Sequence, residues 1–376
     1  MQFSDEDNFR LNVLLANDIQ AIRIDESTMT VYGLSARGEA KVQLHPTCRD
    51  GRYLKQVREL ISSHVLGSPG GYPIFLRRWS RMGQAKAESL AQLLMLGEPE
   101  AVAAVVNAPS LTAELARRAW WAESSSQNAR GMLANEQIAQ SDFGQILAKH
   151  LIDYLPFEEE PMHIIESVRL VLQADLITPA DKQALWQKGK KKNVYLVGFL
   201  WSSPDALPVL TPTHPQVEYF TTQLTPLCTA GNPIAQQLIR LLKNTGQAFL
   251  TTAEQVLRKP THQEVVNILF DIIADYFNTI CPDEYGDIEI TQLLEQATQF
   301  CQNPPDNQLG QAVNAVLTEL PESQTLVQAM LVLAGLRYSL VRPIFSRTTA
   351  IGSLMRKKLA PVTEPILTQF AILRGV

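Results

Sequence analysis

The sequence predicts a mainly α protein, a helical array or bundle with a small N-terminal antiparallel β meander. Apolar residues recur at helical spacing from about residue 52 onward, and before that point they alternate with polar residues. The chain has 376 residues, of which 45% are hydrophobic and 19% are charged. It is therefore long enough for two or three domains with substantial cores.

Residues 1–50 predict the meander. Alternating segments at 22–25, 29–31 and 40–44 are separated by turn residues at 25–28 and 36–38. A meander of this size is marginally stable by itself, so we expect it to pack against helices.

Residues 51–205 predict a domain of short helices. The apolar stripe over 54–61 fits one helix, and helix stop and start signals follow at Gly97–Pro99, Pro109–Ser110 and Thr178–Asp181. Short helices with short connections indicate a helix-hairpin array or a compact bundle. The stretch has no fixed period of the tetratricopeptide or ankyrin kind.

A break at 202–215 predicts a linker or domain boundary, because four prolines in so short a span do not fit one helix. We expect a second helical domain over 206–376. Within it, residues 265–277 are apolar on nearly all sides of a helix, which predicts a central, buried element.

Charge and cysteine content limit the functional class. The formal net charge of −5 argues against a surface that binds nucleic acid everywhere, although a local basic groove is compatible with it. The four cysteines are scattered without CxxC spacing, as expected of reduced thiols in a cytosolic protein: Cys48, Cys228, Cys281 and Cys301.

Nothing in the sequence predicts export or membrane insertion. The start is acidic and lacks the basic and apolar regions of a secretory signal. The longest apolar runs, 194–201 and 326–336, fall short of the roughly 20 residues that span a bilayer. We therefore expect a soluble cytoplasmic protein with no membrane partner.

Two arginine clusters in helical segments are candidate binding residues. They comprise Arg77, Arg78 and Arg81, and then Arg117 and Arg118 with Trp121. Arginine forks bind phosphate or carboxylate, and tryptophan stacks on a base or a guanidinium. The alternative is that the tryptophans anchor the core while the arginines lie on the surface and pair with Glu88, Glu114 or Glu123. The sequence favours the alternative, because such short motifs have little specificity.

The glycine-rich turn at Gly67–Pro73 is a second candidate. Gly70 and Gly71 could present backbone N–H groups to an anion ahead of Arg77. A tight turn between helices is the simpler interpretation, because the chain has neither GxxxxGK[ST] nor GxGxxG. This turn with its following arginines is still the best place in the sequence for an anionic ligand.

A lysine-rich segment is the third candidate. Lys190, Lys191 and Lys192 could contact nucleic acid or an acidic partner. They also end a helix that begins near Pro179, where cations and a glycine stop are expected, and the sequence favours this capping role. We interpret Arg356–Lys358 in the same way, as cations that cap the end of a helix before Pro361.

The sequence contains no motif of catalytic or metal-binding chemistry. None of the six histidines lies in HExxH or in zinc-finger spacing, and there is no GxSxG elbow. We therefore expect no metal and no cofactor, and the sequence holds no DNA-binding motif. A catalytic site assembled from distant residues stays open, because such sites are spatial and not sequential.

Several phrases resemble a known family. They are Arg10–Ala16, Ala21–Ser27, Val31–Ser35, Gly67–Pro73, Leu96–Val102, Leu115–Ala122 and Ser167–Gln173. The chain resembles the DsrS proteins, which are encoded beside the dissimilatory sulfite reductase machinery of bacteria that oxidise stored sulfur. The resemblance is clearest over 10–200. It implies a soluble cytoplasmic accessory protein with a regulatory role in expression of the sulfur-oxidation genes after transcription, and it carries over no catalytic residues.

Three functions compete. The first is a non-enzymatic accessory protein of sulfur oxidation that binds a protein or RNA; its RNA version predicts one exposed basic face holding both arginine clusters. The second is a plain protein–protein scaffold, with Trp186 or Trp201 in an exposed apolar patch. The third is an unrecognised enzyme, with a cleft built from His64, the glycine turn and Arg77.

Overall fold

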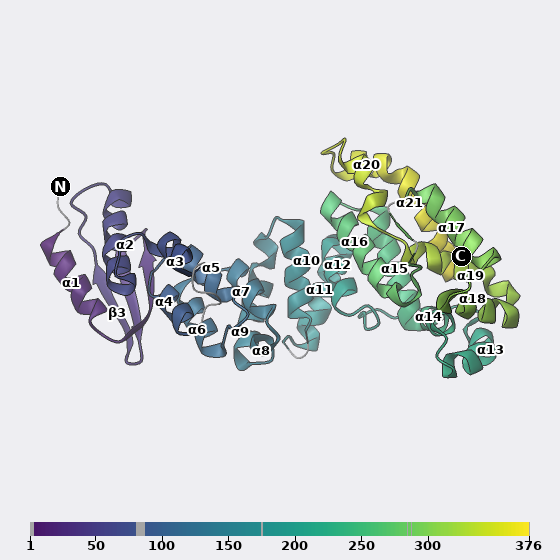
Figure 1. Ribbon diagram of the computed structural model, residues 1–376, viewed down its shortest axis with the longest axis horizontal. Coiled ribbons are helices and arrows are strands. Elements are labelled where there is room, and N and C mark those ends of the chain that lie inside the picture. Colours follow the sequence, from purple (N-terminus) through teal and green to yellow (C-terminus); the bar gives the residue numbers. More distant parts are fainter. Residues whose placement is uncertain (1–3, 80–86, 174–175, 284, 287, 376) are drawn as a thin grey trace. The chain divides into compact units, whose positions relative to one another are not determined.

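The fold class that the sequence predicts is confirmed. The computed structural model describes residues 4–375 except 80–86, 174–175, 284 and 287, and it describes only the backbone of 76–79, 87 and 88 (Figure 1). Helices make up most of the described chain, and the strands form one small antiparallel sheet near the N-terminus. The chain divides into two compact units, Met1–Pro156 and Phe157–Val376.

The first unit contains the sheet and a series of mostly short helices (Figure 1). The strands are β1 (Ile19–Asp25), β2 (Thr30–Ser35) and β3 (Gly38–Gln43). The helices are α1 (Asp5–Leu15), α2 (Asp50–Leu66), α3 (Gly71–Trp79), α4 (Ala87–Leu94), α5 (Pro99–Val106), α6 (Ala113–Ala122), α7 (Ser126–Leu133), α8 (Glu136–Ala139) and α9 (Asp142–Tyr154). Helices that are close in sequence pack on one another, and α4 and α6 also pack against β1.

The sheet is the predicted meander. Strand β2 pairs antiparallel with β1 on one side and with β3 on the other, so Val31 lies opposite both Ile24 and Val42. The apolar members of the alternation pack into a cluster with α1 and α2. Strand β3 is an edge of the sheet, and its residues Gly38–Lys41 are exposed.

Helix α1 is absent from the predicted elements. It begins after Ser4, whose hydroxyl accepts the N–H of Asp7 at 3.4 Å, and three acidic residues occupy its first turn, where the helix dipole favours them. Leu11, Leu14 and Leu15 are buried against the sheet. The acidic start that argues against a signal peptide is therefore the capped beginning of a core helix.

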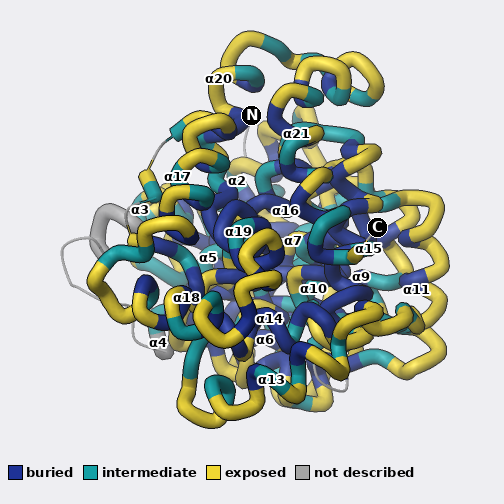
Figure 2. The backbone as a smooth tube through the Cα atoms, turned by 90° about the vertical axis from the view of Figure 1, so that its right-hand side faces the viewer, coloured by how far each residue is buried: buried dark blue, intermediate teal, exposed yellow. Residues whose placement is uncertain are grey.

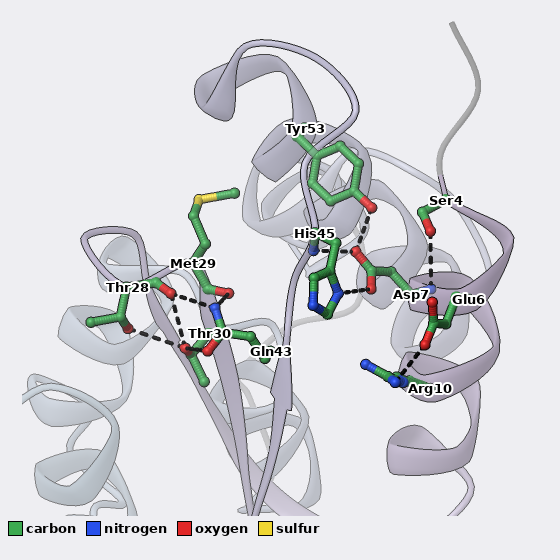
Figure 3. Close-up of polar contacts among 10 residues, drawn as sticks. All are labelled: Ser4, Glu6, Asp7, Arg10, Thr28, Met29, Thr30, Gln43, His45 and Tyr53. Carbon is green, nitrogen blue, oxygen red and sulfur yellow. Dashed lines mark hydrogen bonds and ion pairs between the residues drawn. The ribbon is translucent and has the colours of Figure 1, made fainter.

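A buried carboxylate joins α1 to the rest of this core (Figure 3). Asp7 is fully buried and accepts hydrogen bonds from the Tyr53 hydroxyl at 2.6 Å and the His45 backbone N–H at 2.7 Å. The His45 ring nitrogen Nδ1 lies 3.2 Å from the same carboxylate. Burial by itself would raise the pKa of Asp7, but these hydrogen bonds outweigh it and lower the pKa below its ordinary value.

The second unit is helical in all its regular described elements (Figure 1). Its α-helices are α10 (Pro161–Val171), α11 (Pro179–Lys191), α12 (Val194–Ser202), α13 (Val217–Thr229), α14 (Pro233–Leu242), α15 (Asn244–Arg258), α16 (Gln263–Tyr276), α17 (Ile290–Gln302), α18 (Gln308–Glu319), α19 (Gln324–Ala334), α20 (Arg342–Phe345) and α21 (Gly352–Arg374). Short 3-10 helices are η1 (Leu155–Phe157), which crosses the boundary, η2 (Asn278–Ile280), η3 (Pro321–Ser323) and η4 (Tyr338–Leu340).

The proline-rich segment is non-helical, as predicted, but it lies inside the second unit. Helix α12, which precedes it, packs against α10 and also against α15 and α16, which follow it. Asp205 within the segment accepts two hydrogen bonds from Arg240, at 2.6 and 3.1 Å, and one from the Tyr276 hydroxyl at 3.0 Å. The prolines interrupt the helices here without interrupting the core, so the unit boundary falls at Pro156 and not at residue 205.

Two helices form the centre of the second unit. Helix α16 is buried along most of its length, as its apolar circumference predicts. Helix α19 is also largely buried, and Figure 2 shows it mostly in dark blue. Among the described helices, none combines the length and the apolar character that a bilayer span requires.

The prediction that a helix ends before Pro361 is wrong. Helix α21 continues through Pro361 and Pro365 to Arg374. Proline inside a helix costs about 3 kcal/mol because it removes a hydrogen bond and clashes with the preceding turn. The buried side chains of α21 pack against α15 and α19, and this apolar contact offsets the cost: Met355, Leu359, Val362, Ile366, Phe370 and Leu373.

Candidate anion-binding site

The glycine-rich turn binds an anion that belongs to the chain itself. The Gly71 N–H donates to the Ser62 hydroxyl at 2.8 Å, and the Tyr72 N–H donates to Oε2 of Glu98 at 3.0 Å. Gly70 and Gly71 have φ angles of 134° and 58°, which L side chains rarely adopt. A Cβ on Gly71 would lie 1.9 Å from Oε1 of Glu98. The turn therefore needs glycine for its positive φ angles, and a Cβ on Gly71 would also displace the Glu98 carboxylate.

The first arginine cluster falls largely outside the described side chains. Arg77 and Arg78 belong to α3, whose backbone alone is described there, and Arg81 lies outside the described residues. The exposed basic face that the sequence associates with both clusters stays a prediction.

The second arginine cluster makes contacts within the first unit. Arg118 forms an ion pair with Glu114 one turn away, as the alternative interpretation expects, and its side chain is 18% exposed. The Arg117 guanidinium lies 5.6 Å from the centre of the Phe143 ring. Trp121 donates its indole N–H to Glu39 of β3 at 3.0 Å, so it fastens α6 to the sheet.

The two tryptophans of the scaffold interpretation differ in exposure. Trp186 is buried and packs edge-on against Phe199, with ring centres 5.1 Å apart. Trp201 is 39% exposed, and the Arg169 guanidinium lies 4.6 Å from its ring centre. Trp186 is therefore a core residue and not part of an exposed patch.

Two of the predicted lysines do reach a cavity. Lys190 and Lys191 line a hollow of about 640 Å³ in the second unit, together with residues of α15 and α21. The cationic side chains on its wall are Lys190, Lys191, Arg258, Lys259, Arg356 and Arg374, and Glu254 is the one acidic residue of the described lining. We call this hollow the basic cavity. Lys192 is exposed at the end of α11 and is not part of the lining.

Helix ends bring several of these cations to the basic cavity. Lys190 and Lys191 lie in the last turn of α11, while Arg258 ends α15 and Lys259 caps it. Cations are stabilised at helix C-termini because the unpaired carbonyl groups make that end negative. The capping role that the sequence favours for the lysines is therefore compatible with a place in the cavity wall.

Helix α21 contributes two cations to the wall of the basic cavity. Arg356 lies near its beginning and Arg374 is its last residue, so 18 residues separate them (374 − 356). At 1.5 Å per residue, this separation is about 27 Å along the helix axis. The two arginines therefore reach the wall from opposite ends of α21, where Arg356 donates to the Pro260 carbonyl and Arg374 to Glu254.

Glu254 orients two of the arginines. Its side chain is 8% exposed and accepts hydrogen bonds from Nε and Nη2 of Arg258, at 2.9 and 2.6 Å. Its other oxygen accepts one from Arg374. Pairing of this kind is what allows a carboxylate to be buried. Lys190, Lys191 and Lys259 have no ion pair among the described residues, so the wall retains a large positive excess.

Neutral polar groups complete the wall. Asn193 donates its side-chain N–H to the Lys259 carbonyl at 2.7 Å. The side-chain oxygens of Asn193, Thr251 and Thr261 are buried without a hydrogen-bond partner among the described residues, which is uncommon for buried polar atoms. The threonine hydroxyls can donate to an oxygen, and the described lining contains no aromatic ring. The arrangement suits recognition of negative charge and not stacking on a base.

The sequence could not identify this site as a whole. The sequence does not single out Arg258, Lys259 or Arg374, and it favours a capping role for Arg356, because a cation at a helix end looks the same whether it only caps the helix or also lines a cavity. Among the described residues, no group of His, Cys, Asp and Glu is placed to hold a metal ion. Comparison with protein-family models, curated proteins and solved structures gave no match to this chain.

Proposed function

We propose that this chain is a non-enzymatic interaction protein that binds RNA, with the phosphates of the strand held in the basic cavity. One observation supports the proposal most: six cationic side chains from separate parts of the chain surround a single buried acid. Phosphate contacts from lysine and arginine dominate the affinity of proteins for nucleic acid. Arginine forks held by Glu254 would present their remaining N–H groups in fixed directions.

The number of cations and the lining of the cavity favour a strand over a compact anion. The cations come from the ends of α11 and α15 and from both ends of α21, which suits contacts with more than one phosphate. The absence of an aromatic ring from the described lining argues for contacts to the backbone and not to the bases, so we expect little sequence preference. The net charge of −5 disfavours RNA binding over the surface as a whole, so a local cluster of cations is what the proposal requires.

The biological context of the proposal comes from the resemblance to the DsrS proteins. An accessory protein of bacterial dissimilatory sulfur oxidation that binds RNA would act on gene expression after transcription, which is the regulatory role that the resemblance implies. Affinity capture of the full chain from sulfur-oxidising cells, with bound RNA and proteins both identified, would test this context. Recovery of proteins alone after nuclease treatment would support the scaffold function instead.

The binding itself is tested with a labelled single-stranded oligouridine and fluorescence anisotropy at several salt concentrations. The test variant is Lys190→Gln/Lys191→Gln/Lys259→Gln, which removes three exposed charges that have no ion pair among the described residues. We expect weaker binding and a shallower dependence of log K on log salt, by about 0.7 for each phosphate that the variant no longer neutralises.

The matched control is Lys188→Gln/Lys192→Gln/Lys357→Gln. It removes the same charge from exposed positions near the ends of α11 and α21 that are not part of the lining. The proposal is wrong if both triple variants lose the same affinity, or if binding does not respond to salt. Equal competition by inorganic tripolyphosphate would show a compact-anion site and not a site for a strand.

A further inference from the structure

A groove runs along the free edge of the sheet in the first unit, far in sequence from the basic cavity. Its volume is about 360 Å³, and it lies between α1 and β3. Helix α1 contributes Phe9, Arg10, Val13 and Leu14, Asn17 follows the helix, and β3 contributes Ala40–Gln43. We call it the β3 groove.

Only every second residue of β3 uses its backbone N–H and C=O groups to bond to β2. Leu44 donates its N–H to the Met29 carbonyl at 2.8 Å, so even-numbered residues here bond to β2 in the observed register. Residues of an antiparallel strand alternate in direction, so Glu39, Lys41 and Gln43 turn their N–H and C=O groups away from β2. No described backbone group bonds to them on that side. The edge therefore offers a regular row of donors and acceptors.

Apolar side chains accompany this row. Phe9 is 70% exposed and Val13 is 50% exposed, and they lie four residues apart on one face of α1. Leu14 continues the apolar wall inward to the core. Single exposed apolar residues are ordinary, but two beside an unpaired strand edge match the layout of a groove that takes an extended peptide.

The charges of the groove select its occupant. Arg10 and Lys41 are its charged residues, and the described lining contains no acid. Arg10 pairs with Glu6 at 2.5 Å, on a part of α1 where both side chains are exposed. Lys41 has no ion pair among the described residues. Glu39, on the same face of β3 as Lys41, is paired with Arg23 and Trp121, so Lys41 is the unpaired charge among the described residues of this edge. A segment whose carboxylates face Lys41 would therefore be attracted to the edge.

We infer that the β3 groove binds an extended acidic segment of a partner protein, which adds as a fourth strand beside β3. Its main chain bonds to Glu39, Lys41 and Gln43. Its alternate apolar side chains pack on Phe9 and Val13, and its carboxylates face Lys41. This site is independent of the RNA proposal, because its residues all belong to the first unit.

The probe is a fluorescein-labelled peptide of about ten residues in which valine alternates with threonine and glutamate, a length typical of a longer strand. It is mixed with the full chain, and binding is followed by anisotropy and by hydrogen–deuterium exchange of the backbone. We expect saturable binding, with exchange slowed about tenfold or more at the amides of Glu39, Lys41 and Gln43. The same peptide methylated at its strand-facing nitrogens should not bind.

A proline variant separates main-chain pairing from charge. Lys41→Pro removes an outward N–H that β2 does not use, and proline is tolerated on edge strands. Lys41→Ala removes the same charge and keeps the N–H. We expect Lys41→Pro to weaken the probe about fivefold more than Lys41→Ala. Unchanged exchange protection of the amides that pair β1 with β2 is the check that the sheet remains folded.

Three results would overturn the inference. The first is binding without protection of these amides, and the second is equal loss of binding in the two Lys41 variants. The third is protection that rises with protein concentration in the absence of peptide, together with a doubled mass in light scattering. That last result would assign the edge to a second copy of this chain and not to an acidic partner.

Discussion

The Asp7 carboxylate and the Tyr53 hydroxyl are joined by a buried hydrogen bond of 2.6 Å that spans 46 residues of sequence. It fixes α1 to α2 across the end of the sheet (Figure 3). Burial, followed by the hydrogen bond to Asp7, raises the pKa of Tyr53 to about 12. The first unit therefore depends on an ionised Asp7 and a neutral Tyr53 at neutral pH.

We expect the free energy of unfolding of the first unit to fall in acid, and we expect this fall to be smaller in the Asp7→Asn variant. The pKa of Asp7 is lowered from 3.8 in the folded state, so its stabilising effect is complete above about pH 4 and is lost as the pH falls through the folded pKa. Urea unfolding between pH 6 and about pH 2 measures this. Asp7→Asn should lower the free energy of unfolding by about 1–3 kcal/mol at neutral pH. Its free energy of unfolding should then decline less steeply than that of the wild type as the pH falls.

Asp25 contributes to the same acid range and provides the control. Hydrogen bonds from Ser27 and then Thr28 lower its pKa to about 2, with the same sign of pH dependence. Asp25→Asn should therefore remove a separate part of the acid response and leave the part due to Asp7. A decline identical in wild type and Asp7→Asn would contradict the role given to Asp7.

Two glycines should respond in opposite directions to alanine. Gly71→Ala places a Cβ 1.9 Å from the Glu98 carboxylate at a φ of 58°, so we expect a loss of about 1–3 kcal/mol in the free energy of unfolding. Gly51→Ala lies in α2, where a Cβ meets nothing within 4 Å, and should stabilise by about 0.5–1 kcal/mol. Thermal unfolding followed by circular dichroism compares them, and equal shifts would contradict the backbone strain that an alanine is expected to introduce at position 71.

Glu254→Gln should strengthen RNA binding while it weakens the fold. The change removes the acid from the wall of the basic cavity and loosens Arg258 and Arg374, so the affinity for oligouridine and its salt dependence should both rise. Loss of charge-assisted hydrogen bonds should cost about 1–3 kcal/mol in stability. Glu264→Gln, an exposed acid at the start of α16, is the control of equal charge change. Tighter binding in both variants alike would point to overall charge and not to the cavity.

Asp205→Ala should release the proline-rich segment. Without its hydrogen bonds to Arg240 and Tyr276, the segment around Leu210, which is 98% exposed, should be cut faster by thermolysin. The Arg240 and Asp205 side chains are 37% and 46% exposed, so we expect a loss of stability of about 1 kcal/mol or less. Limited proteolysis followed by mass spectrometry locates the cut. An unchanged rate of cleavage would mean that the prolines alone hold the segment.

The elements that the sequence predicts well are those whose signal is local. Alternation between turn residues identified the strands, and the apolar circumference of 265–277 identified a buried helix, because each pattern is complete within one element. Helix α21 could not be predicted from its own sequence. The energetic cost of its two prolines is offset by packing against helices that are distant in sequence. Tertiary contact outweighs helix propensity there.

The candidate site was predictable only in part for the same reason. Lys190 and Lys191 stood out as a charge run. Arg258 and Glu254 have the spacing of an ordinary i,i+4 helix pair, and Arg374 lies 120 residues from Glu254, so the sequence does not indicate that the three meet.

The glycine turn was also predictable only in part. Its sequence favoured a tight turn between helices and offered the Gly70 and Gly71 N–H groups to an external anion. In the fold the Gly71 N–H bonds to Ser62, and it is the Tyr72 N–H that bonds to the carboxylate of Glu98.

The packing of α12 determines how this protein can be divided in the laboratory. All seven residues from 194 to 200 are buried, through contacts with helices on both sides of the proline-rich segment. In a truncated chain that stops near residue 205, the apolar side chains of α12 would be exposed to water, and we expect that chain to precipitate. Expression of the two halves separately should succeed only with a cut close to Pro156, and the C-terminal half would then carry every wall of the basic cavity with it.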